Sequence, residues 1–484
     1  MSNKKNNGHY ELNIKRLFLT VGAIYIALVV AFYFLAGEQL HLRKSRGNLE
    51  MPVADATTIE LSQGQVIEQY FTCRIQRLES ITVLWSIYGH PDAGTLTVEL
   101  CREQDGEILL RQDFDTSTLV DGLPFTLHAD RPIETVYDIP LVLRFYADSQ
   151  PGMGGSPVIC STAQTDNFSL RLNGELTPGS VCFTAEGTDY IWIGLHYWAL
   201  TGALGLFIAL VLLLVWKRSR RGKHSYIINA LIALDKYRFL IRQLVSRDFK
   251  TKYKRSVLGV FWSFLNPLLM MLVQYFVFST IFQSNIPNFA AYLIIGTVMF
   301  NFFSESVGMA LTSVLGNAGL ITKVYMPKYI YPLTRLLSSL VNLAISMIPM
   351  TIVCLITGVH LQKSAVLALF FMFCLVVFCL GLGMLLSTSM VFFRDTQFLW
   401  SVVVMMWMYI TPIFYPESIL PDNLRFVLSF NPLHMFIKNV RMCILSGLSP
   451  EPMVYVQCLL VAMGALFVGA LLFRLNQDKF VLYL

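Results

Sequence analysis

Five basic side chains fall within nine residues, directly before a long apolar stretch of the chain. They are Arg247, Lys250, Lys252, Lys254 and Arg255. Basic side chains at a membrane surface attract anionic headgroups and phosphates, and each such charge contributes about 1 kcal/mol. The cluster is therefore a candidate contact for lipid headgroups or for the phosphates of a bound substrate. Simple anchoring of the adjacent membrane span accounts for it equally well.

Motifs of enzyme active sites are missing from the sequence. G-x-x-x-x-G-K-[ST], H-E-x-x-H, a C-x-x-C pair and G-x-S-x-G do not occur, and the eight histidines lack metal-ligand spacing. Asp113 and Asp115 form the D-x-D that glycosyltransferases use, but they fall in a segment that we expect outside the membrane, away from nucleotide sugars. We predict no catalytic residue, no metal site and no cofactor in this chain, and no nucleic-acid partner.

The composition is that of a membrane protein. Hydrophobic residues make up 55% of the chain and charged residues 14%, which is too apolar for a soluble globular domain. Apolar stretches of about 20 residues cross a bilayer as helices, so membrane lipids are an expected partner. We expect eight spans, at residues 17–36, 191–216, 257–283, 289–314, 331–357, 364–391, 397–413 and 453–474.

Charge is divided unevenly along the chain. Residues 46–189 contain 21 acidic residues, eight arginines and no lysine, a net charge of −13, whereas the whole chain carries +6. Positive charge is retained on the cytoplasmic side of membranes, and the run KRSRRGK at 217–223 marks such an end. We therefore expect residues 45–189 to form an extracytoplasmic domain, with residues 1–16 and the C-terminus in the cytoplasm.

The acidic segment has the pattern of a β-sandwich. Alternating apolar residues in GTLTVEL, LVLRFY and NFSLRLNG predict strands, with turn signals such as EQDGE and VDGLP between them. About eight short strands indicate an all-β sandwich of jelly-roll type. Four cysteines in this segment permit two disulfides in three pairings, or else four buried free thiols; they are Cys73, Cys101, Cys160 and Cys182.

Residues 224–250 predict an amphipathic helix in the cytoplasmic interface. Apolar residues recur there at helical spacing from Ile228 to Leu244, with basic residues among them. A soluble helix packed on a partner protein is the alternative. The remaining residues, 251–484, form a core with six of the expected spans, and Pro267 should kink the first of these.

Five pieces of the C-terminal half occur in a distinctive order. They are RDFKTKYKRSVLGVFWSFLNPLL (247–269), NAGLITKVYMPKYIYPLTRLLSSLVN (317–342), FFRDTQFLW (392–400), ITPIFYPESIL (410–420) and NPLHMFIKNVRMCILSG (431–447). Together they resemble the permease subunit of ABC-2 type exporters, in the branch that moves O-antigen, capsule and teichoic acid polymers. The first two spans and the β-domain lie outside this resemblance.

The resemblance implies how the cytoplasmic side works. The loop around residue 323 would be a coupling helix that docks on a separate ATPase subunit, and that subunit would bind ATP and Mg. Its contact candidates are Leu320, Ile321, Lys323, Met326 and Pro327. A short re-entry into the next span is the alternative. The basic cluster at 247–255 would lie beside this ATPase and beside the diphosphate of a lipid-linked substrate.

Residues 409–442 are half-apolar and too short between their four prolines for complete spans. This pattern suits re-entrant helices beside a protein-lined cavity at the external face. The resemblance implies an external gate there, with Tyr409, Phe414 and Tyr415 as candidates, whereas an interfacial aromatic belt is the alternative. Arg441 could balance Glu417 or Asp422, or bind a phosphate.

A polar polymer needs a wet path, and aromatic rings along it can stack on sugars. The candidates are Phe276, Phe282, Phe300, Phe302 and Phe303. Packing against lipid or other helices is the more favoured interpretation for each of these rings.

We therefore expect the permease subunit of an ATP-driven exporter in the bacterial cytoplasmic membrane. Two copies, with a separate ATPase, would move a polysaccharide or polyol-phosphate polymer carried on a polyprenyl diphosphate. The outer domain would bind the emerging glycan or a cell-wall protein, and its −13 charge favours a neutral glycan or a protein over a phosphate-rich polymer. The alternatives are a membrane-anchored glycan receptor or envelope-assembly scaffold, and a glycosyltransferase, for which no acidic cytoplasmic loop is visible.

Overall fold

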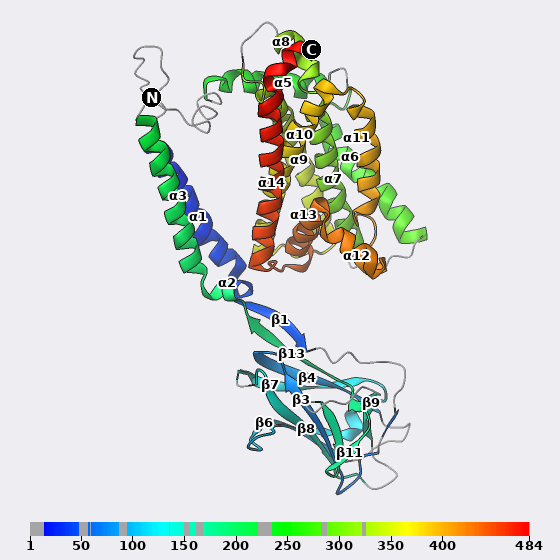
Figure 1. Ribbon diagram of the computed structural model, residues 1–484. Coiled ribbons are helices and arrows are strands. Elements are labelled where there is room, and N and C mark those ends of the chain that lie inside the picture. Colours follow the sequence, from blue (N-terminus) through cyan, green and yellow to red (C-terminus); the bar gives the residue numbers. More distant parts are fainter. Residues whose placement is uncertain are drawn as a thin grey trace. The chain divides into compact units, whose positions relative to one another are not determined.

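The computed structural model describes residues 14–47, 57–58, 60–86, 94–134, 136–149, 155–160, 168–220, 235–254, 256–281, 288–321 and 326–483. The chain divides into two compact units. One comprises Met1–Leu40 together with His196–Leu484 and is helical, and the other comprises His41–Leu195 and is built of strands (Figure 1). The expected fold class, a polytopic helical membrane protein with an inserted all-β domain, is confirmed.

Seven of the described helices are long and apolar enough to cross a membrane. They are α1 (Ile14–Ala36), α3 (Tyr197–Arg220), α6 (Phe261–Tyr275) with its π-helical continuation η3 (Phe276–Ile281), α7 (Phe289–Leu311), α9 (Ile330–Ile356), α10 (Ala368–Phe392) and α14 (Pro452–Asn476). The eighth expected span coincides with α11 (Thr396–Ile410), which has 15 residues. Because an α-helix rises about 1.5 Å per residue, α11 alone is shorter than the roughly 30 Å hydrocarbon core.

Shorter helices lie at the two ends of the bundle. One end holds α5 (Arg238–Lys252), α8 (Ala318–Ile321) and α15 (Phe480–Tyr483), and the other holds α12 (Asp422–Ser429) and α13 (Pro432–Arg441), as Figure 1 shows. The helix α5 covers the C-terminal part of the expected interface helix at 224–250. Residues 224–234 of that prediction lie outside the described residues.

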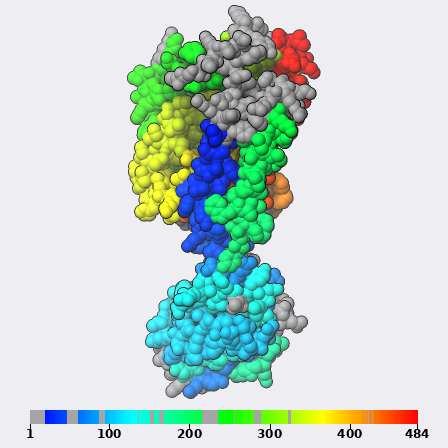
Figure 2. Space-filling model, turned by 90° about the vertical axis from the view of Figure 1, so that its left-hand side faces the viewer, coloured from blue at the N-terminus to red at the C-terminus, as the bar shows by residue number. Residues whose placement is uncertain are grey.

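The core of the helical unit is built around α7 and α10. In the membrane-length window of α7 72% of the residues are buried and in that of α10 50%, whereas in those of α1 and α3 only 6% are. The helices α1 and α3 pack against each other instead, and the two lie side by side in Figure 2. The Tyr197 hydroxyl donates to the carbonyl of Val29 at 2.7 Å, and the Tyr25 hydroxyl donates to that of Thr201 at 2.5 Å. Lipid would cover the remaining apolar surface of this pair of helices.

Two glycines allow α10 and α14 to pack with their backbones almost in contact. A Cβ atom added at Gly469 would lie 1.9 Å from the carbonyl oxygen of Gly381, and one added at Gly381 would lie 2.4 Å from the backbone of Ala465. Small residues at such a crossing allow membrane helices to approach closely, because packing contacts replace the hydrophobic effect inside lipid.

The β unit consists of two antiparallel sheets. One has the strand order β1-β13-β4-β9-β12, with β2 on β9 and β7 on β4, and the other has the order β11-β10-β3-β8-β5-β6. The strands are β1 (Leu42–Gly47), β2 (Thr57–Thr58), β3 (Val66–Cys73), β4 (Arg77–Ser86), β5 (Thr95–Arg102), β6 (Ile108–Asp115), β7 (Pro124–Ile133), β8 (Ile139–Ala147), β9 (Ser156–Cys160), β10 (Ser169–Leu172), β11 (Glu175–Thr177), β12 (Ser180–Val181) and β13 (Phe183–Tyr190). The residues predicted to point inward from β5, Leu96, Val98 and Leu100, are fully buried in the core between the sheets.

A row of alternating charges crosses the outer face of the six-stranded sheet. Its members are consecutive cross-strand partners from β10 through β3, β8 and β5 to β6: Arg171, Glu68, Arg144, Glu99 and Arg111. Arg144 Nε lies 2.9 Å from Glu68 Oε1, and Arg111 Nη1 lies 3.3 Å from Glu99 Oε1. Because opposite charges directly across strands contribute roughly 0.2–1 kcal/mol per pair, the row helps to set the register of this sheet.

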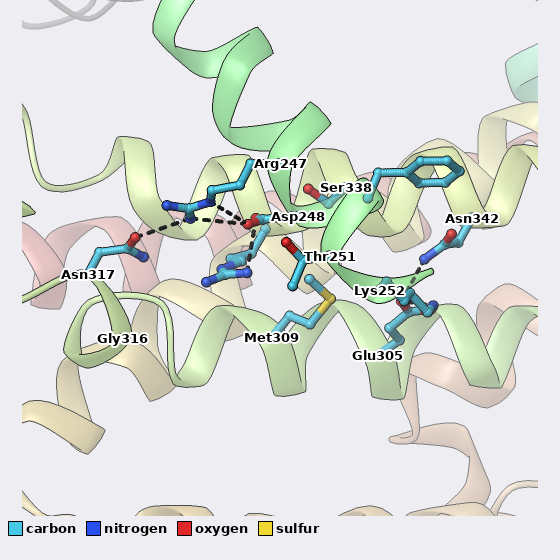
Figure 3. A pocket seen from close by; sticks show the side chains of 12 residues that line it. Arg247, Asp248, Thr251, Lys252, Glu305, Met309, Gly316, Asn317, Ser338 and Asn342 are labelled. Atoms are coloured by element: carbon cyan, nitrogen blue, oxygen red, sulfur yellow. Dashed lines mark hydrogen bonds and ion pairs between the residues drawn. The ribbon is translucent and has the colours of Figure 1, made fainter. Parts of the chain in front are cut away.

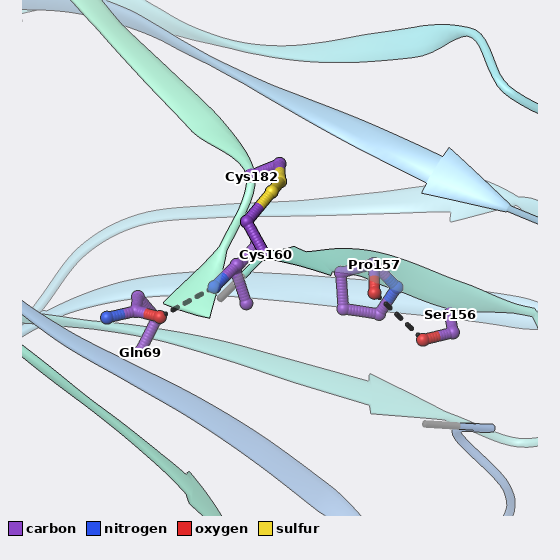
Figure 4. Close-up of a disulfide and its surroundings, with 6 residues drawn as sticks. Gln69, Ser156, Pro157, Cys160 and Cys182 are labelled. Carbon is purple, nitrogen blue, oxygen red and sulfur yellow. Dashed lines mark hydrogen bonds between the residues drawn. A yellow bond between two sulfur atoms is a disulfide. The ribbon is translucent and has the colours of Figure 1, made fainter. Parts of the chain in front are cut away.

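A disulfide joins Cys160, at the end of β9, to Cys182, which follows β12 (Figure 4). Beside it, the side chain of Gln69 accepts a hydrogen bond from the backbone N–H of Val181 at 2.8 Å. Cys73 and Cys101, the other two cysteines of the predicted set, are buried free thiols. Burial raises the pKa of both thiols, which keeps them protonated and unreactive. The domain therefore has one disulfide and two free thiols, an arrangement between the two that we considered from the sequence.

We expect Gly469→Ala to destabilise the helical unit. The added methyl group would collide with the backbone of α10, so the two helices must separate, and overpacking of this kind costs about 1–3 kcal/mol. The melting temperature of the purified protein in detergent should therefore fall. Gly464→Ala in the same helix is the matched control, because a Cβ atom there meets nothing within 4 Å. Equal melting temperatures for the two variants would contradict the close packing of α10 and α14.

Candidate functional site

A pocket of about 640 Å³ lies at the end of the bundle that holds α5. Its walls come from α5, α7, α9 and the turn before α8, as Figure 3 shows. Two members of the predicted basic cluster, Arg247 and Lys252, line it. The other lining residues include Asp248, Glu305, Asn317, Arg335, Ser338 and Asn342. The pocket is thus the place where the basic cluster meets the membrane helices.

Asp248 is the most buried charge in the wall, with its side chain 5% exposed. Its carboxylate lies 3.0 Å from the guanidinium of Arg335 on α9 and 3.1 Å from that of Arg247, its neighbour on α5. Arg247 also donates to the side-chain oxygen of Asn317 at 3.4 Å. One acidic side chain therefore joins α5 to α9 and, through Arg247, to the turn before α8.

Glu305 makes the second connection, and it is the only charged residue of α7. Its carboxylate accepts from Lys252 Nζ at 2.7 Å and from Asn342 Nδ2 on α9, also at 2.7 Å. Tyr253, just after α5, donates to Asn342 Oδ1 at 3.3 Å and lies in close contact with the hydroxyl of Ser263 on α6. A polar network thus ties the end of α5 to α6, α7 and α9.

The charges of this arrangement can bind an anion. Three cations, Arg247, Lys252 and Arg335, line the pocket together with two carboxylates, so the cations outnumber the anions by one. Arg247 and Lys252 have about half of their side chains exposed, so their remaining N–H donors are open to a phosphate in the pocket. Of the rest of the predicted cluster, Lys250 and Lys254 are exposed outside the pocket, and Arg255 lies outside the described residues.

The predicted coupling segment is partly folded back into this chain. Met326 is buried in a cluster with Ile330 and Tyr331, against which Leu240 and Ile241 of α5 pack. Its side chain therefore packs within this chain. Leu320 and Ile321 of α8 and Pro327 are half-buried, whereas Lys323 lies outside the described residues.

The predicted external-gate residues meet at the other end of the bundle. The ring of Phe414 is buried and stacks on Phe278 of η3, with centroids 5.3 Å apart and planes inclined by 9°. The hydroxyl of Tyr415 donates to the backbone carbonyl of Tyr409 at 2.8 Å, while the Tyr409 ring itself is largely exposed. Tyr409, in the last turn of α11, and Phe414 and Tyr415, in the turn that follows, therefore belong to one local structure.

The candidate channel phenylalanines divide into two groups. Phe300, Phe302 and Phe303 are buried in the packed core, where the Phe303 ring contacts Trp400 and Trp407 of α11. Within the single chain they pack helices together, as the favoured interpretation had it. Phe276 is exposed on η3, and Phe282 lies outside the described residues.

Arg441 has a role that the sequence did not predict. We considered Glu417, Asp422 or a phosphate as its partner, but its guanidinium binds backbone carbonyls of Tyr292, Pro412 and Ile413. Glu417 instead contacts Lys438 at 2.9 Å and His434 at 3.4 Å. The arginine in NPLHMFIKNVRM signals a polar partner in an apolar setting, but only the fold shows that the partner is backbone.

Comparisons with known proteins converge on transport. Residues 240–445 match the family model described as ABC-2 type transporter. Over 249 residues, 51% of this chain and 96% of the relative, the chain is 28% identical to the O-antigen export system permease protein RfbA of Myxococcus xanthus. It is 30% identical to a Klebsiella pneumoniae protein of the same name over 210 residues, 43% of this chain and 81% of that relative. The polysialic acid transport protein KpsM of Escherichia coli is 22% identical over 246 residues, 49% of this chain and 93% of its own length.

We expect Asp248→Asn to loosen α5 from α9. The change leaves Arg247 and Arg335 facing each other without the anion between them, and losing a hydrogen bond to a charged group costs about 2 kcal/mol. Amide hydrogen exchange over residues 238–252 should therefore become roughly 30-fold faster. Lys250→Gln in the same helix, at an exposed position, is the control and should leave exchange unchanged. If both variants exchange like the unaltered chain, Asp248 does not hold the helix.

Proposed function

Because the chain belongs to the ABC-2 type transporter family, in the branch of polysaccharide-export permeases, we propose that it is the membrane-spanning subunit of an ATP-driven polysaccharide exporter. The observation that carries the proposal is the match over residues 240–445, which contains the pocket, the coupling segment and the turn after α11. The expected place of action is the bacterial cytoplasmic membrane.

A separate ATPase subunit would supply the energy. The sequence has no P-loop, so ATP and Mg would bind to that partner and not to this chain. The partner would dock where α5 and α8 lie together, because Leu320 and Ile321 of α8 pack on the same buried cluster as α5. A displacement of α8 by the ATPase subunit would then reach the transmembrane helices through the contacts of Asp248 and Glu305.

Two copies of the chain would enclose the transport path. One copy exposes apolar faces that need a cover, and α11 alone exposes Phe398, Leu399 and Val402. Lipid covers such faces in an isolated subunit, and a second copy would cover some of them in a dimer. The tightly packed core of α7 and α10 supports a path between copies over one through a single copy.

The proposed substrate is a glycan or polyol-phosphate polymer on a polyprenyl diphosphate. The pocket beside α5 offers the guanidinium of Arg247 and the ammonium of Lys252, which suit a diphosphate at the membrane surface. Its volume of about 640 Å³ is enough for a headgroup and not for a polymer. The pocket would therefore bind the diphosphate end of the lipid while the glycan chain enters the path.

The β-domain would lie outside the cytoplasm. Its disulfide between Cys160 and Cys182 supports this placement, because structural disulfides persist in oxidising compartments and are rare in the cytosol. There the domain would bind the emerging glycan or a cell-wall protein. Its acidic composition continues to favour a neutral glycan or a protein as the ligand.

A membrane-anchored glycan receptor or envelope scaffold is the alternative function. The β-domain is the observation that favours it, because a sandwich held at the membrane suffices for such a role. This alternative function does not account for the polar network between α5, α7 and α9.

The exporter makes a direct biochemical prediction. Co-expression with the ATPase subunit of the proposed exporter should yield a complex whose ATP hydrolysis rises on addition of lipid-linked glycan. Leu320→Asp and Ile321→Asp should abolish the complex, since a buried carboxylate at an interface is costly. Ile419→Asp, at an exposed site on the other end of the bundle, should leave it intact. A purified chain that binds no ATPase, with polymer still reaching the cell surface in a deletion strain, would refute the exporter.

The orientation of the chain can be tested independently of transport. A cysteine introduced at Leu176, which is exposed on the β-domain, should react with a membrane-impermeant maleimide in intact cells. A cysteine at Lys250, exposed on α5, should react only after permeabilisation. The native free cysteines described in the structure are all buried, so the unaltered chain provides the background. The reverse pattern of labelling would show that the domain faces the cytoplasm.

A further inference from the structure

The turn after α11 places non-helical backbone in a buried position at one end of the helical bundle. Helix α11 ends at Ile410, and Thr411 already has extended backbone angles (φ −80°, ψ 128°). The next regular element, η6 (Glu417–Ile419), begins six residues later. Irregular backbone at membrane depth is tolerated only where the protein supplies partners for its N–H and C=O groups. The question is which side chains supply them.

Arg441, at the end of α13, supplies most of these partners. Its Nη1 donates to the carbonyl of Pro412 at 2.7 Å, and its Nη2 donates to that of Ile413 at 2.9 Å. The same Nη2 and Nε reach the carbonyl of Tyr292 on α7, at 3.0 and 3.2 Å. The residue is only 8% exposed. One guanidinium therefore joins three elements: the turn, α7 and α13.

Tyr292 completes the arrangement from α7. Its hydroxyl lies 2.9 Å from the carbonyl oxygen of Tyr415 and 3.2 Å from that of Pro412. The centre of the Arg441 guanidinium lies 3.4 Å from the centroid of the Tyr292 ring, which is a close cation–π contact. Two stacked side chains thus satisfy the carbonyls of residues 412, 413 and 415.

Gly296, one turn further along α7, makes room for the guanidinium. A Cβ atom at this position would lie 2.4 Å from Nη2 of Arg441 and 3.2 Å from the side chain of Ile413. The absence of a side chain is therefore a condition for the contact. Tyr292 and Gly296, one turn apart on α7, and Arg441, about 150 residues later, together hold the turn.

The turn carries two of the three residues that we expect to form the external gate, Phe414 and Tyr415. Phe414 lies between the carbonyls of Ile413 and Tyr415, both of which are held, and its ring stacks on Phe278 of η3. Arg441 and Tyr292 therefore fix the position of the Phe414 ring. Any displacement of the turn from α7 would separate Phe414 from Phe278.

We propose that Arg441 and Tyr292 are the positioning residues of the external gate, and that they hold the turn at residues 411–415 closed against α7. The inference rests on the proposed function in that it takes this turn as the outer gate of the exporter. An arginine is required because its planar fork reaches carbonyls on two elements at once. A lysine would place one ammonium where three nitrogens now donate.

The test is the accessibility of the turn from outside the cell. A reporter cysteine replaces Ile413, whose side chain is only 1% exposed, and intact cells receive a membrane-impermeant maleimide. With Arg441 present the reporter should stay protected. With Arg441→Gln or Arg441→Lys, labelling should rise about tenfold, which is roughly the shift that loss of one hydrogen bond to a charged group produces. Tyr292→Phe, which removes one hydroxyl, should give a smaller rise and keeps the test available if the arginine variants fail to fold.

The control is Lys438→Gln, which removes another cation from α13. Lys438 is half-exposed and contacts Glu417 on the far side of the turn, so labelling should not change. The background is each variant without the reporter cysteine. Protection of the reporter in folded Arg441 and Tyr292 variants would overturn the proposal. So would full protection in Arg441→Lys alone, or labelling only after permeabilisation.

The labelling experiment requires neither ATPase nor polymer. Its result therefore does not depend on whether the proposed function is correct. A chain that exports nothing can still show the Arg441-dependent protection, and an active exporter can lack it. The additional measurement of polymer at the cell surface tells these cases apart.

Discussion

A backbone group inside a bilayer has no water to bind, and the helical unit is arranged around this constraint. Most of its backbone satisfies itself in helices of membrane length. Where the chain leaves the helix, at the turn after α11, Arg441 and Tyr292 provide the donors that water would provide elsewhere. Burying a cation costs free energy in such surroundings. Arg441 offsets that cost because it donates to several carbonyls that would otherwise lack a hydrogen-bond partner.

The same constraint explains why charge is concentrated at the two ends of the bundle. At one end Asp248 and Glu305 pair with Arg247, Lys252 and Arg335, and they connect α5 to α7 and α9. At the other end Arg441 fastens the turn to α7. Since Glu305 and Tyr292 both lie on α7, one central helix contacts both polar assemblies. A displacement of α5 therefore has a continuous packed element, α7, through which to reach the turn after α11.

The β-domain follows different physics, because water can reach its surface. Its sheets bury one face each, and the outer face of the six-stranded sheet bears alternating charges that pair across strands. Its disulfide adds a covalent link between β9 and the segment before β13. Arginines pair with carboxylates in the β-domain, as Arg247 and Arg335 do at one end of the helical unit, whereas the buried Arg441 binds backbone carbonyls.

The sequence by itself determined the membrane-protein class, the two-unit organisation and the transporter family, because hydropathy, charge partition and short ordered motifs are local properties of the chain. It also identified the basic cluster, and it placed Tyr409, Phe414 and Tyr415 together. Only the tertiary structure decided that Met326 packs inward, that Cys160 pairs with Cys182, and that Arg441 meets carbonyls rather than Glu417. These contacts join residues from about 20 to 150 positions apart. Such partners depend on how helices and strands pack, and no local pattern records that packing.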